Sequence, residues 1–273
     1  EIRKKYKNVE LFILNCGQPL NITYLKKYKL IPVINNLKDL KLWSQYSSKK
    51  YHCILHIDTG MNRLGINLQE LDGLSGTEYF KNINIKFIMS HFACAEDINN
   101  LMNKIQLEEL LNCSQILKKI CKKEIKTSIC NSSGIWLGKE YLLDIVRPGA
   151  AFLGISPTLH IKNPLKEVIS IYAQITQIRE VKKNDTIGYG RTLTIKKNTT
   201  IATLSIGYSN GLSRLLSNIG DVYIKDKKLK ILGRISMDLT VIDISIFKND
   251  EVKNGDIVEI FGPNRSLEEF AKM

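Results

Sequence analysis

The sequence of 273 residues contains no long apolar run and no signal-peptide pattern at its start. A helix that crosses a membrane needs about 18 consecutive apolar residues, so we expect no membrane partner. Cysteine is also sparse: six cysteines lie at irregular spacings without a CxxC pair, and the final 143 residues have none. This usage argues against a disulfide framework or a zinc site, and it predicts a soluble, cytoplasmic protein with reduced thiols.

Histidine and arginine are scarce as well. Four histidines show no metal-ligand spacing, so no metal is expected. The net charge of +13 rests on lysine, because only 8 of the 40 basic residues are arginine and the lysines are scattered. Nucleic-acid-binding surfaces usually concentrate charge and mix arginine with aromatic residues. We therefore expect solvated lysine faces and no nucleic-acid partner, while anionic small molecules remain compatible.

Apolar residues, 44% of the chain, are spread along its whole length. Up to about residue 158, short apolar runs alternate with helical stretches, which predicts parallel strands and a β/α architecture. The candidate strands are 11–14, 31–34, 53–57, 85–89, 127–130 and 145–146, and the clearest helix covers 100–123. Beyond the prolines near residue 160, short β-branched segments separated by turn signals predict a second, mostly β domain. The expected domains are 1–162 and 163–273.

The length of the first domain limits its architecture. A complete eight-stranded α/β barrel needs about 250 residues, with about 30 for each βα unit. The six candidate strands fall short of eight. We therefore expect an α/β barrel, similar to a TIM barrel, whose first two strands are missing.

Polar residues of a kind common in active sites follow the candidate strands. Arg63, in the segment DTGMNRLG, could bind a carboxylate or could be a surface residue beside a helix cap. His91 follows another strand and could be functional or a core residue. Ser132, in NSSG, could bind a phosphate or cap a helix. In RPGA, Arg147 precedes Gly149 and Ala150, where a glycine permits close approach of the backbone to a ligand.

Three further candidates lie in the β domain. Tyr189 stands between glycines in GYGRT, Tyr208 follows Gly207, and Met237 lies in GRISMD. Taken singly, each could be part of a packed turn.

Taken together and in order, the segments DTGMNRLG, SHFA, NSSG, VRPGAAFLG, IGYGRT, IGYSNGLSR and GRISMD closely resemble alanine racemase. The resemblance runs from about residue 11 to residue 262. It implies a pyridoxal 5'-phosphate enzyme with a barrel followed by a β domain. Such an enzyme interconverts L- and D-alanine by two-base proton transfer and supplies D-alanine for peptidoglycan.

The resemblance also implies roles for the residues of the barrel. Ser132 and the backbone at Gly149 and Ala150 would hold the cofactor phosphate, and Arg147 would donate to the pyridine nitrogen. His91 would link Arg147 to the catalytic tyrosine, while Arg63 would bind the substrate carboxylate.

In the β domain, the resemblance makes Tyr189 one of the two bases. Met237 would help Arg63 to bind the carboxylate through its backbone, and Tyr208 would narrow the entrance. In the family these three residues serve the second subunit, which implies a homodimer with shared active sites.

Two departures from the family pattern stand out. A lysine, usually carbamylated, lies in the family seven residues before the arginine of DTGM, whereas this chain has His56. The family's cofactor lysine lies in a motif of the form VKANAYG, and this motif does not occur in the chain. The Schiff-base lysine is therefore not present. We expect a fragment of an alanine racemase that is inactive as written.

Alternative interpretations remain open. One is a related amino-acid racemase of broader substrate range; decarboxylases of the same barrel type fit less well, because their motifs are missing. Others are a non-catalytic or decayed member of the family and a basic nucleic-acid binder.

Overall fold

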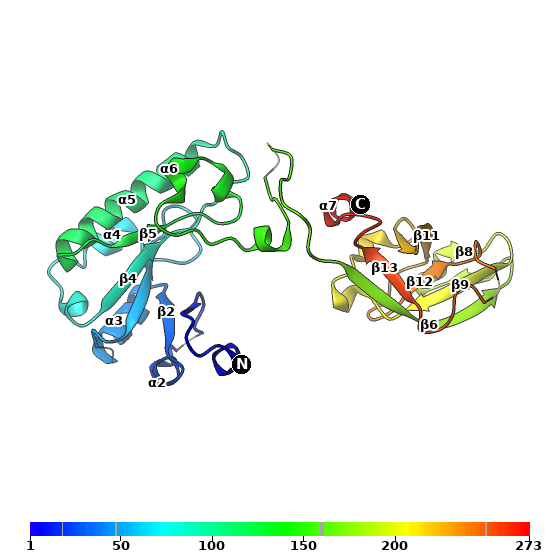
Figure 1. The fold of residues 1–273 in the computed structure, drawn as a ribbon, viewed down its shortest axis with the longest axis horizontal. Coiled ribbons are helices and arrows are strands. Elements are labelled where there is room, and N and C mark those ends of the chain that lie inside the picture. Colours follow the sequence, from blue (N-terminus) through cyan, green and yellow to red (C-terminus); the bar gives the residue numbers. More distant parts are fainter. Residues whose placement is uncertain (18, 47, 159–160, 249) are drawn as a thin grey trace. The chain divides into compact units, whose positions relative to one another are not determined.

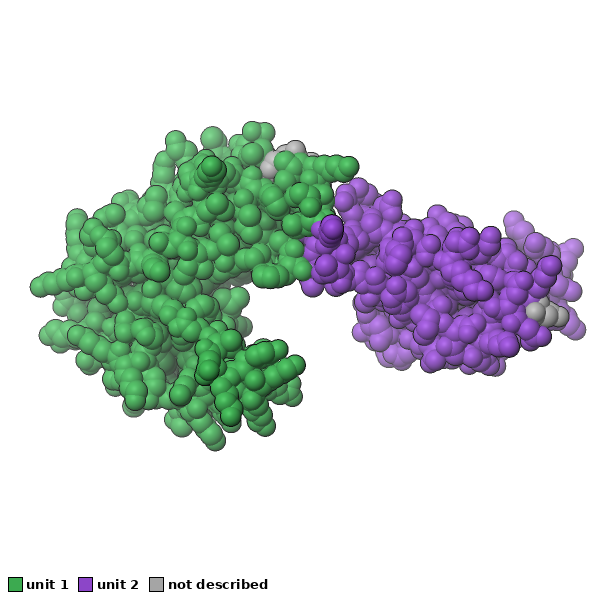
Figure 2. Space-filling view, viewed as in Figure 1, with its two compact units in different colours: residues 1–152, 156–165 green, residues 153–155, 166–273 purple. Residues whose placement is uncertain are grey.

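The computed structural model describes residues 1–17, 19–46, 48–158, 161–248 and 250–273. The chain divides into two compact units, coloured separately in Figure 2. Unit 1 consists of Glu1–Phe152 and Ser156–Leu165, and unit 2 consists of Leu153–Ile155 and Lys166–Met273. Among the described residues, no helix is long and apolar enough to cross a membrane.

Unit 1 is built on a parallel sheet of five strands in the order β1-β2-β3-β4-β5 (Figure 1). Its strands are β1 (Leu11–Ile13), β2 (Leu30–Ile34), β3 (His52–His56), β4 (Asn84–Met89) and β5 (Lys126–Ser128). Five of the six expected strands are confirmed, and the sixth is reduced to a single bridge between Ser128 and Ile145. The sheet is open, with β1 and β5 at its edges, as expected for part of an α/β barrel.

Helices connect the strands because parallel neighbours need a crossover connection. The helices of unit 1 are α1 (Ile2–Lys5), α2 (Ile22–Lys27), α3 (Leu37–Tyr46), α4 (Leu68–Asp72), α5 (Leu101–Cys121) and α6 (Lys139–Leu142), with 3-10 turns η1 (Glu78–Lys81), η2 (Gly134–Trp136) and η3 (Ala150–Leu153). The longest, α5, begins where the side chain of Asn100 accepts a hydrogen bond from the amide of Met102, and it ends at Lys122 in the left-handed conformation. This confirms the helix expected over 100–123.

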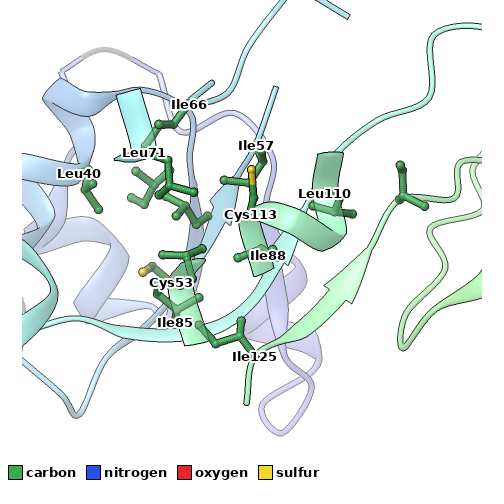
Figure 3. Packing of buried hydrophobic residues seen from close by; sticks show 14 of the residues in the cluster. Leu40, Cys53, Ile57, Ile66, Leu71, Ile85, Ile88, Leu110, Cys113 and Ile125 are labelled. Atoms are coloured by element: carbon green, nitrogen blue, oxygen red, sulfur yellow. The ribbon is translucent and has the colours of Figure 1, made fainter. Parts of the chain in front are cut away.

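The central strands of the sheet in unit 1 are buried on both faces. Along β2, β3 and β4, successive side chains point to opposite faces. Cys53 and Ile88 pack with helix residues such as Leu71 and Leu110 in the large cluster of Figure 3. The neighbouring side chains on the opposite face form a smaller cluster of Ile31, Val33, Ile54, Phe87 and Met89. The buried sheet gives the loops at its carboxyl edge a rigid base.

Unit 2 contains a closed antiparallel barrel in the order β10-β11-β12-β9-β6-β13. The strands of unit 2 are β6 (Ile171–Val181), β7 (Thr186–Ile187), β8 (Leu193–Thr194), β9 (Thr199–Leu204), β10 (Asp221–Ile224), β11 (Lys227–Leu232), β12 (Thr240–Asp243) and β13 (Ile257–Phe261). Strands β7 and β8 form a separate pair, and α7 (Leu267–Ala271) follows the barrel. The mostly β second domain is thus confirmed.

Short 3-10 turns carry the loops of unit 2. They are η4 (Tyr189–Arg191), η5 (Tyr208–Asn210) and η6 (Arg214–Leu216). The barrel beneath them is filled by a core that includes Ile175, Leu204, Val222, Ile242 and Val258. Because the barrel is closed, each of its strands has a neighbour on both sides. The loops therefore extend from strands whose backbone groups are hydrogen-bonded.

Candidate active site

Arg63 lies on an exposed loop that leaves β3 and returns to bridge Ile57 with Ile66. The carboxylate of Asp58 accepts hydrogen bonds from the amides of Gly60 (3.0 Å), Met61 (3.0 Å) and Asn62 (3.1 Å), which closes the loop. Gly65 has a φ of +121°, and a Cβ there would lie 2.6 Å from the amide nitrogen of Asp58. The glycine is therefore required, and the turn presents the arginine at the carboxyl edge of the sheet.

A buried polar network ties this loop to the residues after β4. The hydroxyls of Thr59 and Ser90 lie 2.6 Å apart. The side-chain amide of Gln106 on α5 donates to Thr59 Oγ1 (3.2 Å) and to the carbonyl of His91 (2.9 Å), and its oxygen accepts from the amide of Ala93 (2.9 Å). Gln106 was not among the expected site residues. Its one signal in the sequence is a polar side chain on the apolar face of an amphipathic helix.

The guanidinium of Arg147 lies between the carboxyl ends of β4 and β5. Its Nε donates to Ser128 Oγ (3.0 Å), and its Nη2 donates to the carbonyl oxygens of Ser90 and Ile129. Its Nη1 lies 3.5 Å from Nδ1 of His91. A guanidinium has five N–H groups, so one N–H of Nη1 has no partner among the described residues. This hydrogen is available to a ligand.

Burial and positive charge keep His91 neutral. Desolvation, reinforced by the charges of Arg147 and Arg63, lowers the pKa of His91 to about 4. Burial also lowers the pKa of Arg147, to about 10, which leaves the guanidinium charged at neutral pH. When Nδ1 faces an N–H of Arg147, the neutral ring carries its hydrogen on Nε2. Arg147 can therefore polarise the neutral ring of His91, which strengthens the hydrogen bond that Nε2 donates to an oxygen.

Ser132 lies where two backbone amides converge. Its buried hydroxyl accepts hydrogen bonds from the amides of Gly149 (2.9 Å) and Ala151 (3.2 Å), with Ala150 between them in the chain. Nothing lies within 4 Å of the position of a Cβ on Gly149. Both N–H groups donate to Ser132 Oγ here, and a phosphate oxygen that replaced it as their acceptor would leave the hydroxyl free to donate as well. The amide of Ala151 was not anticipated, since the sequence cannot show which amide of the turn points inward.

Unit 2 carries the other three candidates on neighbouring loops. The amides of Tyr208 and Ser209 donate to the carbonyls of Ser236 (3.0 Å) and Met237 (2.9 Å). Gly188, which precedes Tyr189, would place a Cβ 3.2 Å from the amide of Arg234. Residues 234–237 thus lie against both the turn before Tyr189 and the turn that begins at Tyr208. All three side chains are exposed, Tyr189 by 69% and Met237 by 55%.

Comparison with known proteins relates these features to one family. The family model described as "Alanine racemase, N-terminal domain" matches residues 1–157, and "Alanine racemase, C-terminal domain" matches residues 168–273. The chain belongs to the alanine racemase family. The resemblance found in the sequence is therefore confirmed.

Alanine racemases from two Rickettsia species are among the relatives. The protein of Rickettsia bellii is 38% identical over 96% of this chain, and that of Rickettsia canadensis is 36% identical over 97%. The chain spans 64% of the length of the first and 73% of the second.

Solved alanine racemases share the fold. The structure from Bartonella henselae, with covalently bound pyridoxal phosphate, is 34% identical to this chain and superposes with a TM-score of 0.81. The match covers 97% of this chain and 74% of the Bartonella chain. The structure from Pseudomonas aeruginosa is 25% identical with a TM-score of 0.78. That match covers 99% of this chain and 75% of the Pseudomonas chain.

In this member of the alanine racemase family, each unit gathers its own group of candidate residues. Unit 1 brings Arg147 and His91 together and places Ser132 beside Gly149, while Arg63 stands on the loop after β3. Unit 2 gathers Tyr189, Tyr208 and Met237. Within the described residues, no group of three or more histidine, cysteine, aspartate or glutamate side chains could hold a metal ion.

Proposed function

We propose that this chain serves an alanine racemase, which interconverts L- and D-alanine with pyridoxal phosphate and thereby supplies D-alanine for peptidoglycan. The observation that carries the proposal is the convergence of the amides of Gly149 and Ala151 on Ser132, near the half-buried Arg147, in a chain of this family. The residues present fit the phosphate end of the cofactor, since a phosphate oxygen could replace Ser132 Oγ as the acceptor of the two amides while the hydroxyl donates to the phosphate.

Arg147 would meet the other end of the cofactor. Its remaining N–H on Nη1 would donate to the pyridine nitrogen, a hydrogen-bond acceptor. A guanidinium keeps its proton because its pKa lies far above neutrality, so the ring nitrogen would stay largely unprotonated. When bound, pyridoxal phosphate supplies an electron sink that makes the α-hydrogen of an amino acid acidic. Arg147 would moderate this effect, which favours simple return of the proton over side reactions.

Arg63 and Tyr189 would act on the substrate. The exposed guanidinium of Arg63 would bind the carboxylate of alanine, with the backbone at Met237. In a dimer, the phenolic oxygen of Tyr189 from one subunit would accept a hydrogen bond from Nε2 of His91 of the other and exchange the α-hydrogen on one face of the substrate. The Arg147–His91 pair would stabilise the phenolate form through this hydrogen bond.

We infer that the active form is a homodimer in which Tyr189, Tyr208 and Met237 of one subunit serve the site of the other. Unit 2 exposes large apolar side chains, including Leu215 (83%) and Leu239 (44%), the latter two residues after Met237 in the chain. A second copy of the chain would cover this surface, which explains why a base and a substrate contact stand in solvent. In this homodimer, Tyr208 of one subunit would narrow the entrance to the active site of the other.

The six cysteines form no disulfide, which supports a reducing compartment such as the cytoplasm.

The chain lacks the family's cofactor-lysine motif. We therefore expect Tyr189 to be the single base that these residues provide.

The function is tested by exchange of the α-hydrogen of alanine in D₂O, followed by proton NMR with added pyridoxal phosphate. The chain should exchange the hydrogen of one enantiomer without forming the other, because a single base returns deuterium to the face that it deprotonated. Cofactor affinity, measured by absorbance, should fall about tenfold in Ser132→Ala. Ser133→Ala is the matched control, because this neighbouring buried serine does not bond to the amides of Gly149 and Ala151.

The proposal would be wrong if neither enantiomer lost its α-hydrogen and Ser132→Ala bound the cofactor as tightly as the unaltered chain. Reduction with borohydride followed by intact mass measurement gives a second readout. An adduct on one specific lysine with racemisation of both enantiomers would support the proposed activity but contradict the expectation of a single base.

A further inference from the structure

An open cavity of about 390 Å³ lies at the amino ends of β1, β2 and β3, the opposite edge of the sheet from the loops of the candidate active site. It is lined from residues 3–10, 26–31 and 50–52, three segments that each lead into one of these strands. The lining holds five cationic side chains, those of Arg3, Lys7, Lys26, Lys29 and Lys50. Among the described residues, one acidic side chain lines the cavity, and this carboxylate of Glu10 forms an ion pair with Lys86. The cavity therefore carries an excess of positive charge.

Two of the five cations build the walls of the cavity. The guanidinium of Arg3 donates to five carbonyl oxygens at 2.8–3.1 Å, three within residues 6–9 and two at residues 28–29. The ammonium group of Lys26 donates to the carbonyl of Tyr46 and lies 5.0 Å from the ring centre of Tyr51. These contacts join the three segments. The cavity is therefore part of the folded frame of unit 1.

The other three cations have no such partners. The ammonium groups of Lys7, Lys29 and Lys50 form no hydrogen bond and no ion pair with any residue that the structure describes. Each comes from a different segment of the lining, and like charges gathered at one cavity repel one another. A monovalent anion could compensate one of these charges. An anion with several separated negative charges could compensate all three.

Lys29 has a backbone conformation that lysine seldom adopts. It follows the C-cap of α2 with a φ of +49°, in the left-handed region where glycine or asparagine is favoured. Its amide donates to the carbonyl of Lys26 (3.2 Å), and its carbonyl accepts from Arg3 (3.1 Å), so this conformation is fixed. A lysine here strains the backbone, and its ammonium group gains no contact within the described residues. Strain of this kind is typical of functional sites, and here it indicates a ligand for the side chain.

We propose that this cavity binds a short chain of phosphates, with the ammonium groups of Lys7, Lys29 and Lys50 as its ligands. Such a chain occurs as a free polyphosphate or as the triphosphate of a nucleotide, and the chemistry that the cavity recognises is the same. The site lies at the amino edge of the sheet, whereas Ser132 follows a strand at the carboxyl edge. Binding in the cavity is therefore independent of the proposed racemase function.

The aromatic rings around the cavity favour a small polyphosphate over a nucleic acid. Proteins hold single-stranded nucleic acids largely by stacking bases on aromatic rings. In and beside this lining, Lys26 lies over the ring of Tyr51, and Lys27 lies 5.5 Å from the ring centre of Tyr28. Since these rings already contact lysines, the cavity offers positive charge rather than a surface for stacking.

Lys29→Asn tests the site, because asparagine tolerates the left-handed conformation and the substitution removes only the cationic side chain. Lys122→Asn is the matched control. Lys122 ends α5 in the same region of backbone conformation, with a φ of +52°; it is exposed like Lys29 but does not line the cavity. The probe is tripolyphosphate, titrated calorimetrically into the chain at a fixed ionic strength.

The unaltered chain should bind one tripolyphosphate at least about tenfold more tightly than orthophosphate, because three ammonium groups meet it. Lys29→Asn should weaken this binding about tenfold without lowering the thermal unfolding midpoint, and Lys29→Arg should retain the affinity. Lys122→Asn should change the affinity by less than about twofold. Titration with ATP separates the sources: tighter binding of ATP would identify a nucleotide, and tighter binding of tripolyphosphate would identify the free chain.

Four outcomes would overturn the proposal. One is the absence of tripolyphosphate binding, and another is equal weakening by Lys29→Asn and Lys122→Asn, which would reveal diffuse attraction to a lysine-rich surface. A third is a single-stranded oligonucleotide that binds more tightly than ATP in a manner dependent on Lys29, which would assign the surface to nucleic acid. The last is loss of tripolyphosphate binding in Ser132→Ala but not in Lys29→Asn, since the anion would then occupy the proposed cofactor site.

Discussion

The two units hold their candidate residues in opposite ways. In unit 1, Arg147 and Ser132 are fixed by hydrogen bonds to backbone and side chains at the ends of buried strands. In unit 2, Tyr189 and Met237 stand in solvent, and only the backbone of their loops is held. Groups that would bind a cofactor are therefore pre-organised within the chain. Groups that would complete the site are presented on a surface, and in the proposed homodimer they would take their environment from a second chain.

The largest effect on stability is expected for Arg147→Ala. The substitution leaves Ser128 Oγ and the carbonyls of Ser90 and Ile129 without their donor, and each such loss costs about 1–3 kcal/mol. We expect unit 1 to lose about 3–4 kcal/mol. Urea unfolding followed by tryptophan fluorescence measures this, since both tryptophans, Trp43 and Trp136, lie in unit 1.

Arg63→Ala is the matched control for Arg147→Ala. Arg63 is exposed and makes no hydrogen bond to the described residues, so its removal should change stability by less than about 0.5 kcal/mol. Equal effects of the two substitutions would show that the guanidinium of Arg147 is not integrated into the frame of unit 1.

A smaller difference should appear as the pH falls. No histidine occurs in unit 2, whereas His56 and His91 of unit 1 each have a pKa lowered to about 4. A histidine with a lowered folded pKa binds protons more readily when unfolded, so its contribution to stability is lost as the pH falls from about 6.5 to about 4. We expect unit 1 to lose on the order of 2 kcal/mol over this window, after allowance for screening by water.

Unit 2 should be nearly unaffected over the same window. Its Asp221 has a lowered pKa, so the contribution of this carboxylate is lost only below the ordinary aspartate value of 3.8. Hydrogen exchange of peptides from β4 and from β9, measured at pH values across the window, compares the units directly. Parallel loss of protection in both strands would contradict the assignment of the acid sensitivity to the histidines of unit 1.

The sequence predicts the central strands of unit 1 well because they are buried on both faces and contain short apolar runs, Cys53–Leu55 in β3 and Phe87–Met89 in β4. It also predicts α5, whose apolar spacing and Asn100 cap are local signals. Contacts between distant residues are not predictable in this way. Gln106 meets Thr59 from 47 positions away, and Asn35 meets His56 from 21.

Closure of the barrel in unit 2 is likewise a long-range property. The pairing of β13 with β6 joins residues about eighty positions apart, such as Ile257 and Gln174. Residue types indicate burial and turn geometry, but they do not indicate which distant polar groups will form hydrogen bonds with each other. The roles of individual site residues therefore rest on family resemblance, and geometry adds Gln106 and Ala151 to the residues worth testing.

The smallest effects on stability are expected for the side chains that unit 2 presents to solvent. Tyr189→Phe and Met237→Ala should each change the free energy of unfolding by less than about 0.5 kcal/mol, because neither side chain is buried. Tyr189→Phe should nevertheless reduce α-hydrogen exchange of alanine at least about 100-fold, the lower range for removal of a general base. Thermal unfolding and proton NMR measure the two effects on the same samples.

Gly207→Ala is the contrasting change, because it acts on the backbone that holds these loops. A Cβ on Gly207 would lie 2.3 Å from the carbonyl oxygen of Met237, and backbone cannot move away as a flexible side chain can. We expect a loss of about 2–3 kcal/mol together with lost exchange activity. If Tyr189→Phe destabilised unit 2 as much as Gly207→Ala did, the phenol would be a structural group, and its exposure would not reflect a role in a shared site.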